Sequence, residues 1–123
     1  MEKELKDQLV EAKVDIDAGL ARFMNNENLY MKFLNKFIDE PTYQKLKDSV
    51  EAGDVQEAFR QAHTLKGVSA NLSLTAIASS SEKLTELLRN KETATEEEAA
   101  QAKEYMNEIT ENYQVLSGIL KNQ

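Results

Sequence analysis

Apolar residues recur with helical spacing along most of this chain, and that repeat restricts its fold more than any other feature. Near the C-terminus the steps alternate between three and four residues at Ala99, Ala102, Met106, Ile109, Tyr113, Leu116 and Leu120. The same alternation relates Leu74, Ile77, Ser81, Leu84 and Leu88. Such a stripe covers one face of an α-helix. One proline and four glycines in 123 residues offer few interruptions, so the sequence predicts an all-α fold.

Capping signals divide the chain into successive helices. Asn26 and Asp54 are suitable N-caps, and Thr95-Glu96-Glu97-Glu98 has the pattern of a capping box whose acidic residues also complement the helix dipole. These signals account for the acidic run without a functional role. The predicted helices cover residues 2–12, 14–23, 26–39, 41–52, 55–72, 74–90 and 96–120.

The only proline marks a further boundary. Pro41 suits the first turn of the helix over residues 41–52, after Asp39 or Glu40 as the N-cap. Gly53 suits the C-cap of that helix, because glycine readily adopts the left-handed conformation found there.

The last four helices are expected to form an antiparallel four-helix bundle over residues 41–121, because helices with apolar stripes and short connections pack as antiparallel neighbours. The N-terminal helices, within residues 1–39, are expected to cap it. Neither repeats nor linkers indicate a second domain, so the prediction is one domain over residues 1–123. Since one chain can supply all four bundle helices, we expect a monomer.

Charge and composition exclude several classes of function. A net charge of −7 argues against nucleic acid or an anionic membrane as the main partner. No cysteine and a single histidine leave no paired ligands typical of a metal site. No apolar run is long enough to span a membrane and the first residues are too charged for a secretory signal, so a cytoplasmic location is expected.

The helix over residues 55–72 is expected to face the core through Val55, Ala58, Phe59, Ala62, Leu65, Ser69 and Leu72. The only histidine lies in an unusual stretch of this helix. His63, Lys66, Gly67 and Ala70 follow one another at spacings that place them on one helical face. Glycine within a helix costs roughly 0.5–1 kcal/mol relative to alanine. A helix that accepts this cost beside its only histidine leaves room for something to approach the imidazole, which we expect at the edge of the apolar stripe and accessible.

The residues Ala62-His63-Thr64-Leu65-Lys66-Gly67, followed by Asn71-Leu72, resemble the signature of histidine-containing phosphotransfer (HPt) domains. The resemblance extends from Asp54 to about Arg89, and more loosely from about Val14 onward. The family pattern has a further glycine after Asn-Leu, where this chain has Ser73.

The resemblance implies a phosphoryl carrier of bacterial two-component signalling rather than an enzyme with its own ATP or metal site. His63 would accept the phosphoryl group, Lys66 would stabilise its charge and Gly67 would give access. Gln56, Arg60 and Ala70 would contact a partner. The implied partners are a response-regulator receiver domain and a hybrid sensor histidine kinase. No cofactor is expected on this chain; magnesium would be supplied by the receiver domain.

Alternative interpretations remain open from the sequence. The chain could be a helical adaptor that binds partners without phosphotransfer, or the HPt fragment of a hybrid histidine kinase. A dimerising kinase domain is a weaker alternative, because no ATP-binding domain follows the histidine helix. For the individual residues, His63 could be an idle surface histidine, Lys66 a solvated charge and Gly67 a packing glycine. Gln56 and Arg60 could be plain surface residues.

Overall fold

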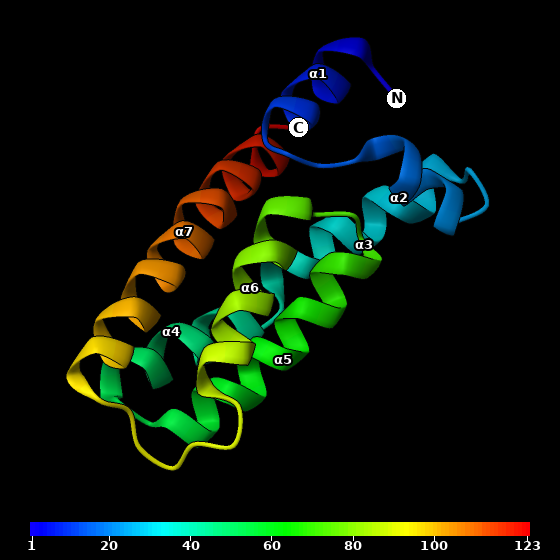
Figure 1. The fold of residues 1–123 in the computed structure, drawn as a ribbon. Helices are drawn as coiled ribbons and strands as arrows, with labels where there is room; N and C mark the ends of the chain where they lie inside the picture. Colours follow the sequence, from blue (N-terminus) through cyan, green and yellow to red (C-terminus); the bar gives the residue numbers. More distant parts are fainter.

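The computed structural model describes all residues from 1 to 123 and contains seven α-helices and no β-sheet (Figure 1). The all-α prediction is confirmed. The helices are α1 (Lys3–Glu11), α2 (Ile16–Arg22), α3 (Glu27–Asp39), α4 (Thr42–Ala52), α5 (Val55–Asn71), α6 (Thr75–Leu88) and α7 (Glu96–Lys121).

Each of the four helices α4 to α7 packs against two of the others. α5 packs against both α4 and α6, and α7 packs against both α6 and α4. The connections between them are short, and α5, α6 and α7 run side by side along the length of the molecule in Figure 1. The histidine helix α5 therefore lies between two neighbours, and its remaining face is available to solvent.

The helix α3 packs against the side of one of these four helices. α3 packs against α7, where the Phe37 and Tyr113 rings lie with centroids 6.0 Å apart. The Tyr113 hydroxyl also donates a hydrogen bond to the carbonyl oxygen of Ile38. Because α7 has 26 residues and α4 only 11, α4 cannot cover α7 alone, and α1 and α3 also pack against it.

The apolar stripes seen in the sequence form one continuous core of 23 buried residues. The α6 stripe is buried at every position, and the α7 stripe is buried except at Ala99 and Tyr113, which are half-buried. In α5 the expected inward positions are buried with one exception, since Phe59 is only half-buried. That exception places an aromatic ring at the surface beside His63.

The helix boundary at Pro41 differs from the sequence prediction. Neither Asp39 nor Glu40 caps α4; Pro41 itself occupies the N-cap, without a side-chain cap, and its carbonyl accepts from the Lys45 amide at 2.9 Å. Glu40 has an extended backbone, with φ −68° and ψ 135°. The Glu40 carbonyl accepts no bond of this kind, so the helix begins after Pro41. The predicted caps Asn26, Asp54, Thr95 and Gly53 are all present.

An extended contact joins the N-terminal segment to the turn between α5 and α6. Val14 and Leu74 form an isolated antiparallel bridge, in which the Asp15 amide donates to Ser73 and the Thr75 amide donates to Lys13. Ser73 lies in the left-handed region with φ 60°. Left-handed geometry is less costly for glycine than for serine, which explains why the family pattern has glycine here.

The C-terminal end of α5 is also held by a tyrosine from α3. Tyr30 is fully buried, and its hydroxyl donates a 2.7 Å hydrogen bond to the carbonyl oxygen of Leu72, the residue that ends α5. Burial, with a smaller contribution from the charge of Asp15, raises the pKa of Tyr30 to about 12. Tyr30 therefore stays neutral while it donates this bond.

The raised pKa of Tyr30 predicts a loss of stability in alkali. The unfolded tyrosine ionises near pH 10 and the folded one near pH 12. The stabilisation is therefore complete below about pH 10 and is lost as the pH rises to about 12, with a total near 2–3 kcal/mol. Urea unfolding of the parent and of Tyr30→Phe should give a difference in unfolding free energy that is constant to about pH 10 and then shrinks. A difference independent of pH up to 11.5 would contradict this assignment.

Candidate functional site

The single histidine lies on the solvent-facing side of α5. Asp54 begins this helix, and its carboxylate accepts from the Glu57 amide at 3.2 Å. Two turns later His63 is exposed, as are Gly67 and Ala70, while Lys66 is half-buried. The helix therefore brings the four residues of the sequence motif to one face, with the imidazole accessible.

The His63 ring lies against the aromatic ring one turn before it. The centroids of Phe59 and His63 are 6.2 Å apart and the ring planes differ by only 11°. This is the geometry of an offset parallel stack. His63 makes no hydrogen bond within the chain, so its contact with Phe59 is the specific side-chain interaction the structure records for it.

Two charged residues of α6 and its C-cap complete this side of the site. The Arg89 guanidinium carbon lies 5.4 Å from the centroid of the Phe59 ring. Arg89 also binds both carboxylate oxygens of Glu86, with Nη2 at 2.8 Å and Nε at 3.2 Å. The hydrogen bonds from Arg89 are the main reason that the pKa of Glu86 lies below its usual range; the proximity of Lys66 and His63 adds a smaller lowering effect. Glu86 therefore lies within electrostatic range of both side chains.

The other side of the site is open at Gly67. A Cβ atom at this position would meet no atom of the protein within 4 Å, so Gly67 is not a packing glycine. It opens onto a groove of about 640 Å³ between α3 and α5, whose apolar lining includes Phe33, Phe37 and Val68. Nothing within this chain requires glycine here.

Lys66 and Arg22 approach the same hollow, of about 370 Å³, beside Ala70. No ion pair or hydrogen bond engages the Lys66 ammonium within the chain. Arg22 is engaged: its guanidinium donates to the carbonyl oxygen of Ala70 and, at 3.1 Å, to the Ser73 hydroxyl. Lys66 is therefore the unpaired cation nearest along the helix to His63.

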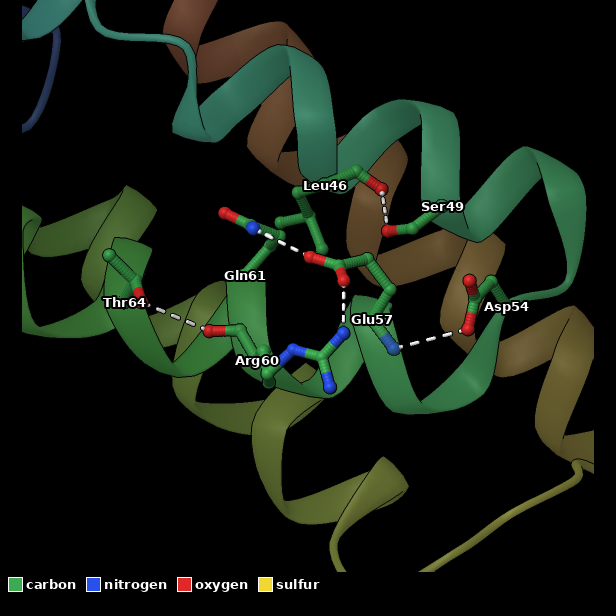
Figure 2. A network of polar contacts seen from close by, with 7 residues as sticks. All are labelled: Leu46, Ser49, Asp54, Glu57, Arg60, Gln61 and Thr64. Carbon is green, nitrogen blue, oxygen red and sulfur yellow. Dashed lines mark hydrogen bonds and ion pairs between the residues drawn. The ribbon is translucent and has the colours of Figure 1, made fainter.

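Gln56 and Arg60, the other two candidates for partner contact, lie nearer the N-terminal end of α5 than His63 does. Both are exposed. Figure 2 shows that Arg60 turns toward Glu57, with which it forms an ion pair. The amide of Gln61 donates to the other oxygen of Glu57 at 2.7 Å. These bonds, first that of Gln61 and then that of Arg60, hold the pKa of Glu57 below its usual range. Arg60 is thus engaged within α5, whereas no side-chain bond is recorded for Gln56.

The sequence did not reveal every residue that lies around the His63–Ala70 face of α5. Arg22, Glu86 and Arg89 reach the site only through tertiary packing, and no motif marked them. Phe59 was assigned to the core from its helical spacing. Its separation of four residues from His63 was the available signal that the two rings could touch.

Two further findings concern metal binding and membrane spanning. No group of three or more His, Asp and Glu side chains is placed to bind a metal ion. None of the seven helices is both long enough and apolar enough to span a bilayer.

Comparison with known protein families gives one match. The model described as "Hpt domain" matches residues 33–116, a stretch that includes α4, α5 and α6, the second half of α3 and most of α7. A comparison with curated proteins and one with solved structures each give no match. Hpt domains are helical bundles that take part in two-component phosphotransfer as phosphoryl carriers. Because the matched stretch is more than half of the sequence and contains the exposed His63, this chain belongs to the Hpt domain family.

Proposed function

We propose that this protein relays a phosphoryl group between receiver-domain aspartates through His63. The observation that carries the proposal is the exposed imidazole on α5, with an unpaired lysine one turn away and an open glycine beside it. Family membership supports phosphotransfer in general; the specific relay through His63 is our inference.

The proposed step is a direct exchange between two side chains. The unprotonated imidazole nitrogen of His63 attacks the phosphorus of an aspartyl phosphate, so that the N–P bond forms as the O–P bond breaks and the aspartate leaves as a carboxylate. The reverse exchange delivers the group to another receiver. Such transfers depend mainly on positioning and on charge stabilisation. Lys66 supplies a cation on this chain, and we expect the receiver domain to supply magnesium.

The test is transfer of label from a receiver domain. The purified chain is mixed with a receiver domain carrying labelled phosphate on its aspartate, and the label is followed with time. We expect label on this chain in an acid-labile, alkali-stable form, as a phosphoramidate requires. Absence of label across several receivers that nevertheless bind the chain would favour the adaptor interpretation.

Lys66→Ala is expected to slow transfer by roughly tenfold or more, because charge-assisted contacts to phosphate contribute about 1.5–3 kcal/mol. Single-turnover transfer at saturating receiver measures the effect. Lys66→Arg should retain most of the rate, since it keeps the charge. Lys103→Ala, an exposed lysine on α7, is the matched control and should transfer as the parent does. An unchanged rate in Lys66→Ala would remove this residue from the mechanism.

Gly67→Ala should separate stability from function. The new methyl group contacts no other atom of the protein, so the free energy of unfolding should increase by about 0.5–1 kcal/mol. If a partner approaches over this position, the same methyl group should slow transfer by roughly tenfold. Gly118→Ala is the matched control, because that helical glycine is also exposed and equally open. It should gain similar stability in thermal unfolding and transfer normally. Equal transfer by both variants would show that access is not the role of Gly67.

A further inference from the structure

The contact between Phe59 and His63 has a geometry that matters for phosphoryl transfer. The lone pair of an imidazole nitrogen lies in the plane of the ring, so the direction of nucleophilic attack turns with that plane. A histidine on an exposed helical surface can rotate about its Cβ–Cγ bond, because that terminal torsion is broad. In this protein the ring is instead parallel to Phe59 within 11°.

The Phe59 ring is also contacted by a residue at the C-terminal end of α6. It packs partly against the core, and the guanidinium of Arg89 lies over its ring at 5.4 Å. Arg89 is fixed in turn by two bonds to Glu86. The plane of the Phe59 ring is therefore set by the packing of α6 against α5 rather than by α5 alone.

We propose that Phe59 is a positioning residue for His63, which limits rotation of the imidazole so that its lone pair stays in the plane from which the incoming phosphorus is attacked. The inference rests on the proposed function of His63 as phosphoacceptor. Stacking leaves both ring nitrogens free, because they lie at the edge of the ring and not on its face. A phosphoryl group bonded in the ring plane also leaves the stack intact, so the same contact serves acceptance and donation. Alignment of reacting atoms is a major part of the rate in such transfers.

The test compares the full-length chain with Phe59→Leu and Phe59→Tyr. Single-turnover transfer from a labelled receiver domain is measured over a range of receiver concentrations. We expect Phe59→Leu to lower the maximal rate by about five- to tenfold, while the half-saturating concentration stays within twofold. Phe59→Tyr keeps the ring and should stay within twofold of the parent in both quantities. A change confined to the half-saturating concentration would assign Phe59 to partner binding and overturn the proposal.

Tyr105→Leu is the matched control. Tyr105 is another partly buried aromatic residue packed against the core. It lies on α7, whereas Phe59 and His63 lie on α5. It should transfer at the parent rate. If Tyr105→Leu and Phe59→Leu slow transfer equally, the effect is general loosening of the core and the proposal is wrong. It is also wrong if Phe59→Leu transfers at the parent rate while the parent accepts label normally.

An NMR measurement tests the geometry without any phosphotransfer. The ring protons of His63 should show nuclear Overhauser contacts to those of Phe59 and a ring-current shift that Phe59→Tyr retains and Phe59→Leu loses. Absence of inter-ring contacts in the parent would overturn the proposal even if Phe59→Leu failed to fold. Failure of the proposed function would look different: the parent would accept no label while the stacked rings remained visible.

Discussion

His63→Gln is expected to abolish transfer of label from a receiver domain, with a rate at least roughly 100-fold below that of the parent. Glutamine offers a neutral side chain of similar reach, but its amide nitrogen has no available lone pair for attack on phosphorus. His63 is exposed and makes no hydrogen bond within the chain, so the folded state loses little beyond the contact with Phe59. The free energy of unfolding should change by no more than about 0.5 kcal/mol.

The comparison is made with parent and variant at equal receiver concentration, with label separated from the receiver and tested for acid lability. Circular dichroism and thermal unfolding establish that the variant is folded. Label on the His63→Gln chain at a rate near that of the parent would place the phosphoryl group on another residue. A variant that still binds the receiver but carries no label would locate the chemistry at His63 and the docking elsewhere on the surface.

Gly19→Ala is expected to have the largest effect on stability. Gly19 is buried in α2, and a Cβ atom there would lie 2.4 Å from the hydroxyl oxygen of Tyr30 and 2.5 Å from the ring carbon that bears it. The Tyr30 side chain is fully buried and bonded to Leu72, so it has no free space into which to move. Overpacking of this kind costs about 1–3 kcal/mol, and loss of the hydrogen bond leaves a buried carbonyl unpaired at a further 1–3 kcal/mol.

The better helix propensity of alanine offsets about 1 kcal/mol of this cost. The net loss should therefore be about 1–5 kcal/mol, which lowers Tm by roughly 4–20 °C in a domain of this size. Gly118→Ala again serves as the control, because it makes the same chemical change in open space and should raise Tm slightly. A Gly19→Ala protein as stable as the parent would mean that Tyr30 can move, and that its bond to Leu72 contributes little.

The helix caps that depend on neighbouring residues in the sequence were predicted correctly. Asn26, Asp54 and Thr95 each accept a backbone N–H three residues ahead, as their side chains predict, and Gly53 has φ 71° at the end of α4. Such capping depends on a few neighbouring residues, so it can be read without knowing the fold. The Pro41 boundary was wrong because the first intrahelical bond is accepted by the carbonyl of Pro41 itself and not by that of Asp39 or Glu40.

The surroundings of His63 were less predictable, because periodicity gives the direction of a side chain but not what covers it. Phe59 has the spacing of a core residue, yet it is half-buried beneath Arg89 and beside His63. Arg22 reaches the end of α5 from α2, and its bonds to Ala70 and Ser73 depend on how the N-terminal segment folds back. These contacts join residues distant in sequence and follow only from the packing of the helices.

The hydrogen bond from Tyr30 to Leu72 also affects where this domain can be cut. The stretch that the family model recognises begins at residue 33, after Tyr30 and after the segment that pairs with residues 73–75. A fragment trimmed to that stretch would keep His63 but leave the last carbonyl of its helix without the phenol that satisfies it. We therefore expect the cooperative folding unit to be larger than the stretch that the family model matches, because the first thirty residues help to hold the C-terminal end of α5 in place.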